Sequence, residues 1–223
     1  MIDLQGKRVL LTQAREFMGP ALAQAFERSG ATVIADAGLL DEPGRPAVLV
    51  AEAGRIDVLV AHLSLPAPRS TAAEASDEEW RYVFAHLVDP LPRLVRAVLP
   101  QMIERRSGKI LLMGSAAALR GQKRASTYSA ARGAQLAYVR SVGVEAAPFG
   151  VQVNAIAQNF VDNPTYFPPE LQALPAFQER LKRDVPLGRL VSAEEDAAFA
   201  AYLCSDAADC FVGQVFPVAG GWA

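Results

Sequence analysis

The stretch RVLLTQAREFMGPALAQAFERSGATVIAD, residues 8–36, decides the fold. Its first apolar run, 9–11, is short and follows polar residues, which is typical of a buried strand. Apolar residues then recur at helical spacing from 18 to 28, Ser29 and Gly30 end the helix, and a β-branched run starts at 32. The stretch therefore predicts a strand, a helix and a second strand.

The same alternation continues along the chain. Further apolar runs at 56–61, 109–113, 151–157 and 215–218 predict four more strands, with helix-like segments ahead of the middle two. Near-continuous apolar strands that alternate with helices indicate a parallel sheet covered on both faces. We predict one α/β domain over residues 1–223, a Rossmann-type doubly wound sheet. The Pro-rich stretch 164–175 falls in an expected active-site insertion at about 158–186.

Composition excludes several kinds of partner. The chain has 223 residues, 51% of them apolar, and a formal net charge of −2 from 22 basic and 24 acidic side chains. Without a basic stripe, nucleic acid is not expected as a partner. No apolar run is long enough to span a membrane, and residues 1–8 lack a signal-peptide core, so we expect a cytoplasmic protein with no membrane association. Cys204 and Cys210 lack metal-ligand spacing, and we expect reduced interior cysteines and no metal site.

Three residues carry the predicted chemistry. Ser115 follows the strand at 109–113, where ligands of doubly wound sheets bind, and Tyr128 and Arg132 are one helical turn apart. A guanidinium one turn away stabilises a tyrosine phenolate, so Tyr128 could take a proton from a substrate hydroxyl that Ser115 holds. The alternative is that Tyr128 and Arg132 are only a surface pair at helical spacing.

A serine, a tyrosine and a basic residue at this spacing resemble the short-chain dehydrogenase/reductase superfamily. The resemblance runs from about Gly6 to Gly220, Gly221 and Trp222. In that superfamily the basic residue is a lysine, which also contacts the nicotinamide ribose. Arg132 replaces that lysine here, and the two side chains are not interchangeable at a tight polar site.

The first turn departs from the superfamily pattern. Relatives that bind a dinucleotide have T-G-x-x-x-G-x-G here, because the pyrophosphate needs a backbone free of Cβ atoms, whereas residues 12–19 read TQAREFMG. Gln13 and Phe17 put side chains where the phosphates would lie. Only 19 residues separate Asp36 from the run at 56, so the adenine wall is expected to be missing and Asp36 to be vestigial. We therefore expect no cofactor.

The pair of motifs T-x4-F-x-G and S-x12-Y-x3-R is similar to the halohydrin dehalogenases, relatives that use no nicotinamide. The resemblance implies a halide pocket in the place of the nicotinamide, built from backbone amides and aromatic edges. It implies conversion of vicinal haloalcohols to epoxides with release of halide and a proton, the reverse opening of epoxides by azide, cyanide or nitrite, and a homotetramer. The residues that match the halide or nucleophile pocket are Phe17, Gln158, Asn159, Phe160 and Val161, and those of the substrate pocket are Thr12, Tyr166 and Phe167.

Several alternatives stay open on the sequence. The chain could be an NAD(P)-dependent reductase with an atypical cofactor loop, or a non-catalytic scaffold subunit. Some halohydrin dehalogenases have an acid at the position of Leu63, and the adjacent His62 is expected to be a loop residue without a role in proton transfer. Trp222 could reach a neighbour's site or close its own sheet. Segments 91–102 and 130–144 suit helix packing between subunits or within one chain.

Overall fold

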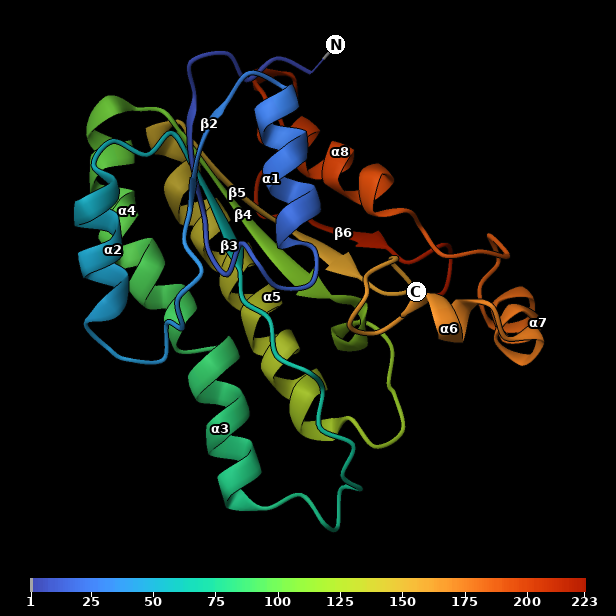
Figure 1. The fold of residues 1–223 in the computed structure, drawn as a ribbon. Helices are drawn as coiled ribbons and strands as arrows, with labels where there is room; N and C mark the ends of the chain where they lie inside the picture. The colour runs from blue at the N-terminus through green and yellow to red at the C-terminus, as the bar shows by residue number, and fades with distance from the viewer. Residues whose placement is uncertain (1) are drawn as a thin grey trace.

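The computed structural model describes residues 2–223, which form one sheet with helices on both faces (Figure 1). The strands are β1 (Arg8–Leu11), β2 (Thr32–Ala35), β3 (Val58–His62), β4 (Gly108–Ser115), β5 (Val151–Gln158) and β6 (Val215–Val218). The helices are α1 (Gly19–Arg28), α2 (Arg45–Ala53), α3 (Asp77–Leu87), α4 (Pro90–Arg105), α5 (Ser126–Ala146), α6 (Pro169–Gln172), α7 (Pro175–Asp184) and α8 (Ala193–Leu203), with short 3₁₀ turns at Ala116–Ala118, Ala147–Phe149 and Asp206–Ala208.

The sheet is parallel throughout and doubly wound, as predicted. Its strand order is β2-β1-β3-β4-β5-β6, so the chain runs outward from β1 to β2 and then returns to the other side of β1. The usual order of this fold has a further strand outside β2. Among residues 2–223 the segment between β2 and β3 supplies only α2, which agrees with the short spacing in the sequence.

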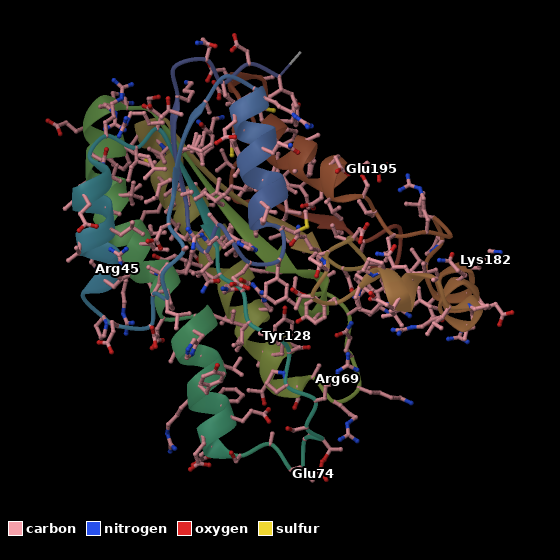
Figure 2. The ribbon with its side chains drawn as sticks, viewed as in Figure 1. Arg45, Arg69, Glu74, Tyr128, Lys182 and Glu195 are labelled. Atoms are coloured by element: carbon pink, nitrogen blue, oxygen red, sulfur yellow. The ribbon has the colours of Figure 1, made fainter. Side chains whose placement is uncertain are left out.

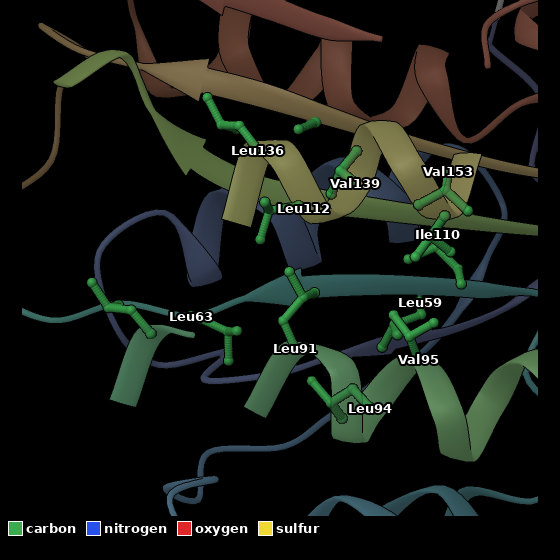
Figure 3. Close-up of a cluster of buried hydrophobic side chains, with 14 of the residues drawn as sticks. Leu59, Leu63, Leu91, Leu94, Val95, Ile110, Leu112, Leu136, Val139 and Val153 are labelled. Atoms are coloured by element: carbon green, nitrogen blue, oxygen red, sulfur yellow. The ribbon is translucent and has the colours of Figure 1, made fainter. Parts of the chain in front are cut away.

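Two cores fill the two faces of the sheet. Side chains alternate across each strand, so Val9 and Leu11 face the layer of α1 and α8, whereas Leu10 faces the layer of α2, α4 and α5. Figure 3 shows the second core, where Leu59 and Ile110 of neighbouring strands pack against α4 and α5. Because both faces of the sheet are covered, we expect a polar site at the ends of the strands.

The Pro-rich segment forms a small cluster of its own beyond the carboxyl ends of the strands. Helices α6 and α7 project from the side of the domain toward which β5 points (Figure 1). Their apolar residues, Phe177 and Leu181 among them, are buried against Phe160, with Phe167 and Trp222 packed alongside. The cluster holds residues 158–190 over the end of the sheet.

The structure changes several local expectations. Ser115 is the last residue of β4, and His62 is the buried last residue of β3 instead of a loop residue. Cys204 is buried, which raises the pKa of its thiol to about 12, but Cys210 is exposed and so is not an interior residue. Within residues 2–223, every helix is too short or too polar to cross a membrane.

Candidate active site

One cavity of about 920 Å³ lies at the carboxyl ends of β3, β4 and β5. This is where the topology of a doubly wound sheet places ligands. Every predicted site residue lines the cavity with the exception of Thr12. The lining residues that the sequence predicted are Phe17, Ser115, Tyr128, Arg132, Gln158, Asn159, Phe160, Val161, Tyr166 and Phe167.

Ser115 is positioned by the sheet and by the turn that follows it. It pairs with Gln158 at the end of the β4–β5 ladder, and its Oγ accepts a hydrogen bond from the backbone N–H of Ala117 at 3.2 Å. That bond uses a lone pair of the hydroxyl, so the hydroxyl proton stays available for a ligand oxygen.

Tyr128 and Arg132 lie on one buried face of α5, as their spacing predicts. The Arg132 Cζ lies 5.1 Å from the centre of the Tyr128 ring. Its Nη1 donates to the Met113 carbonyl at 3.2 Å and to Gln135 Oε1 at 3.0 Å, and Gln135 in turn donates to the Leu87 carbonyl. Both Tyr128 and Arg132 are buried, which rules out the surface-pair alternative. Figure 2 shows Tyr128 near the centre of the molecule.

The sequence missed the burial of His62 next to these residues. His62 lines the cavity, and its Nδ1 donates to the Gln13 carbonyl at 3.2 Å, because a carbonyl can only accept. Burial lowers the pKa of His62 to about 4, and the positive charge of Arg132 acts in the same direction. The ring is therefore neutral at pH 7, with Nε2 as an acceptor.

Thr12 is a correction to the predicted substrate pocket. It is fully buried, and its hydroxyl donates to the His62 carbonyl at 2.9 Å. The side chain thus ties the end of β1 to the end of β3 instead of lining the cavity. The sequence could not show which way this hydroxyl turns.

Phe17 and Tyr166 form an aromatic wall of the cavity. Their ring centres lie 5.4 Å apart, and the Tyr166 hydroxyl accepts a hydrogen bond from the Ala67 N–H at 2.9 Å. Burial raises the pKa of Tyr166, and the neighbouring Tyr128 adds to the rise. Tyr166 is therefore protonated at neutral pH and able to act only as a wall and a hydrogen-bonding group.

Asn159 presents a buried donor without a partner. Its backbone N–H donates to the Val218 carbonyl at 3.0 Å, and its Oδ1 accepts from the Phe160 N–H at 2.9 Å, which fixes the orientation of the amide. The Nδ2 group is then buried with no acceptor among residues 2–223. A buried unsatisfied donor costs about 1–3 kcal/mol, so this group favours the binding of an anion or another acceptor. The adjacent Phe160 has a strained φ of 52°.

Gln158 is held from behind by a buried acid. Its Nε2 donates to Asp196 Oδ2 at 2.5 Å, across to the first turn of α8. Asp196 is fully buried, and burial raises its pKa to about 7. Val161, the last residue of this run, is buried and bridges to Val191.

The loop after β1 does not fit a dinucleotide. Gln13 and Phe17 both have positive φ, at 45° and 43°, and the Gln13 side chain is buried, accepting hydrogen bonds from the N–H and hydroxyl of Ser64. Two positions at which pyrophosphate binding requires a backbone without side chains therefore carry large side chains. Gly19 has a packing role, because a Cβ there would lie 2.4 Å from the Ala14 carbonyl oxygen.

Asp36, at the position of a ribose-binding acid, is engaged by the protein itself. Its Oδ1 accepts a hydrogen bond from Arg45 Nη2 at 2.7 Å, and its side chain is largely buried. Arg45 begins α2, the one helix that lies between β2 and β3 in residues 2–223. Neither the loop of residues 12–19 nor Asp36 therefore fits the binding of a dinucleotide.

Trp222 and a set of basic residues complete the cavity. The Trp222 ring lies 6.0 Å from the ring centre of Phe160, so the C-terminal tryptophan packs at its own chain's cavity. Arg69, Arg120 and Arg180 line the mouth. They are far apart in the sequence, and no motif connects them. Within residues 2–223, no three His, Cys, Asp or Glu side chains gather in a way that could hold a metal ion.

Comparison with known proteins gives two kinds of relative. The family model described as enoyl-(acyl carrier protein) reductase matches residues 46–223. A 3-oxoacyl-[acyl-carrier-protein] reductase of Escherichia coli (strain K12) is 28% identical over 99% of this chain and 98% of its own length. A solved structure titled "Dehalogenation enzyme" is 34% identical with full coverage of both chains and a TM-score of 0.92. A halohydrin dehalogenase bound to ethyl (2S)-oxiran-2-ylacetate is 26% identical over 96% of each chain, with a TM-score of 0.89.

Proposed function

Because the chain belongs to the short-chain dehydrogenase/reductase superfamily but has a loop that does not fit a dinucleotide, we propose that it is a halohydrin dehalogenase. The proposed reaction converts a vicinal haloalcohol to an epoxide and releases halide and a proton. The observation that carries the proposal is the pairing of a buried Ser115, Tyr128 and Arg132 set with an aromatic wall and a free amide donor across one cavity. The two dehalogenase structures add support.

The proton transfer in this proposal uses α5 and β4. In the proposed step Tyr128 is the general base that takes the hydroxyl proton of the substrate, with the Arg132 guanidinium beside its ring, while the Ser115 hydroxyl donates to the same oxygen. The Arg132 guanidinium need not move during the reaction, because hydrogen bonds to Met113 and Gln135 already hold it in place.

The displacement itself is intramolecular. The alkoxide attacks the neighbouring carbon from the side opposite the halogen, a C–O bond forms, and the C–halogen bond breaks with its electron pair leaving on the halide. Both reacting groups belong to one molecule, so the protein has to hold them anti to each other and exclude competing water. In reverse, azide, cyanide or nitrite would open an epoxide while Tyr128 returns the proton.

The halide would leave toward Phe17, Asn159 and Phe160. The Asn159 Nδ2 group supplies a neutral donor, and aromatic edges carry partial positive charge. A site built from neutral donors binds a halide weakly enough to release it. By the same proposal no cofactor takes part, and the protein assembles as a homotetramer, which sedimentation analysis would test.

The direct test is release of bromide and acid from a simple bromohydrin such as 1-bromopropan-2-ol. We expect the two products in a one-to-one ratio, without added nicotinamide, and loss of both in the Ser115→Ala variant. Absence of bromide release from the wild type across several short bromohydrins would contradict the proposal.

The rival function is that of a reductase that still binds its cofactor with the altered loop, and the E. coli relative is named a reductase. Titration with NADH and NADPH, followed by fluorescence, separates the two. We expect no saturable binding, because Gln13 and Phe17 fill the phosphate space. Saturable binding would favour the reductase, and neither binding nor bromide release would leave the scaffold subunit.

A further inference from the structure

The mouth of the cavity is strongly basic. Six cationic side chains line it, and we call them the basic rim: Arg69, Arg120, Lys123, Arg124, Arg180 and Arg183. They come from the loop after β3, the loop between the 3₁₀ turn Ala116–Ala118 and α5, and helix α7. The whole chain has a net charge of −2, and Asp184 is the one acidic residue among those that line the cavity, so the rim is a local concentration of positive charge.

The charge of the rim is only partly compensated. Asp184 contacts Arg183 at 2.8 Å and Arg180 at 3.6 Å, so one carboxylate serves two guanidinium groups. The other four members make no ion pair with a carboxylate among residues 2–223. Arg124 Nε instead donates to the Arg69 carbonyl at 2.9 Å, which fixes one cation next to another. Like charges held around a concave mouth focus a positive potential into it.

Two members of the rim contact aromatic rings that reach toward the reacting end of the cavity. The Arg120 Cζ lies 4.8 Å from the Trp222 ring, and its Nη1 donates to the Trp222 carbonyl at 2.5 Å. Trp222 packs edge-on against Phe160. The Arg180 Cζ lies 5.8 Å from the centre of the same Phe160 ring. A guanidinium that stacks through its face keeps N–H groups on its edge for an oxyanion.

The size of the cavity leaves room for a longer molecule. About 920 Å³ is at the upper end of small-molecule sites and exceeds the volume of a three-carbon halohydrin. Phe160 belongs to the proposed halide pocket. It also contacts Trp222, on which Arg120 lies, and Arg180. A substrate with its reacting carbons at Tyr128 would therefore extend its far end toward the rim.

We propose that the substrate carries an oxyanion, a carboxylate or a phosphate, at the end remote from the halohydrin. This inference rests on the proposed function and names the substrate class of the same site. The rim binds the oxyanion through charge-assisted hydrogen bonds, which are shorter and stronger than neutral ones. The reaction is unchanged: the O–H bond breaks, the C–O bond forms, and halide and a proton leave.

The test compares three compounds with one reacting end. They are the terminal bromohydrin of octanoic acid, its methyl ester, and the corresponding bromohydrin of octyl phosphate. Bromide release at low ionic strength should give a kcat/KM about tenfold or more higher for the acid or the phosphate than for the ester, as one charge-assisted hydrogen bond supplies. The preference should shrink as salt is added, because the rim is exposed to solvent.

Variants assign the preference to the rim. Lys123→Gln combined with Arg180→Gln removes two cations and leaves the Arg183–Asp184 pair in place. We expect the double variant to lose most of the preference for the anion, measured as the ratio of kcat/KM for the acid to kcat/KM for the ester in the same variant. The control is Lys182→Gln, on the same helix but outside the cavity lining, at the outer edge of α7 in Figure 2. It should keep the full preference.

The outcomes separate this inference from the proposed function. Equal kcat/KM for acid, phosphate and ester in the wild type overturns the anionic substrate class and leaves the dehalogenase in place, as does a preference that the double variant keeps. If no compound releases bromide, the proposed function fails, and calorimetry with the unreactive diols of the same acid and ester then decides the rim. Tighter binding of the diol acid supports the rim as an oxyanion site, and equal binding overturns it.

Discussion

Two regions that meet at one cavity differ in how they depart from the superfamily pattern. The β4–α5 region keeps the serine and tyrosine and places Arg132 where relatives have lysine, on a strand end and a rigid helix. The loop of residues 12–19 keeps only its last glycine and holds Gln13 and Phe17 at positive φ. The half of the site proposed to transfer the proton lies on regular elements, and the half proposed to bind the leaving group lies on a loop. On this proposal, a change in the loop changes the ligand and leaves the proton transfer unaltered.

The loop also stores strain that the helix does not. Non-glycine residues in the left-handed region cost about 1–2 kcal/mol each. Such strain persists only where the surroundings enforce it, and here the hydrogen bonds of Gln13 to Ser64 and the contact of Phe17 with Tyr166 do so. We infer that residues 12–19 accept a strained backbone because the strained conformation forms the wall of the pocket.

Tyr128→Phe should lower the rate of bromide release more than the changes at Arg132, Phe17 or Asp196 do. Loss of a positioned general base lowers rates by about 10²–10⁴-fold, and the phenylalanine keeps the ring against Arg132. Bromide release is the measurement, with circular dichroism as the check that the variant is folded. A variant with wild-type turnover would remove Tyr128 from the mechanism.

Arg132→Lys should have the next largest effect. It keeps the charge but replaces the planar guanidinium, which lies over the Tyr128 ring while its Nη1 donates to both Met113 and Gln135, so we expect kcat to fall by about 10- to 100-fold. Arg140→Lys, an exposed change on the same helix, is the control and should keep full activity. Equal activity of both variants would show that charge alone suffices at Arg132.

Replacement of Phe17 tests the loop region through a matched pair. Phe17→Ala and Phe17→Gly both remove the aromatic wall, and each should lower kcat/KM by about tenfold. The glycine variant should be more stable than the alanine variant by about 1 kcal/mol, because glycine accepts the φ of 43°. Thermal unfolding measures the difference. An alanine variant as stable as the glycine variant would mean that the loop is not strained.

Asp196→Asn should have the smallest effect on rate and a pH-dependent effect on stability. The folded pKa of Asp196 is about 7, above its ordinary value of 3.8, so its contribution to stability is full below pH 4 and is lost as the pH rises through 7. The variant should therefore gain stability relative to wild type between pH 5 and pH 8, by on the order of 2–4 kcal/mol.

The quantity to measure is the difference in unfolding free energy between the Asp196→Asn variant and the wild type at each pH. The lowered pKa of His62 makes its contribution disappear as the pH falls from 6.5 to about 4, which opposes Asp196 and flattens the wild-type curve. Denaturant unfolding at each pH measures the difference, with Glu194→Gln, an exposed change on the same turn of α8, as the control. A difference that is constant with pH would mean that Asp196 is ionised in the folded protein throughout.

The sequence predicted the regular parts of the molecule well. Apolar runs such as 151–157 identified the strands because a strand buried on both faces must be apolar along its whole length. The spacing of Tyr128 and Arg132 predicted their common face because helix geometry is fixed.

The remainder depends on tertiary packing. Thr12 turns its hydroxyl to the His62 carbonyl, and nothing in the local pattern distinguishes that orientation from one toward the cavity. The basic rim draws Arg69 and Arg180 from distant segments, and only the folded chain brings them together. The Pro-rich segment showed no periodicity from which α6 and α7 could be assigned.

The most direct test of the central claim, that an anion pocket replaces the dinucleotide, is a crystal structure in the presence of both bromide and NADPH. Anomalous scattering from bromide should give a peak in contact with Asn159 Nδ2 and Phe17, and no dinucleotide density should lie along residues 12–19. Dinucleotide density over that loop, with Phe17 displaced and no bromide peak, would contradict the account.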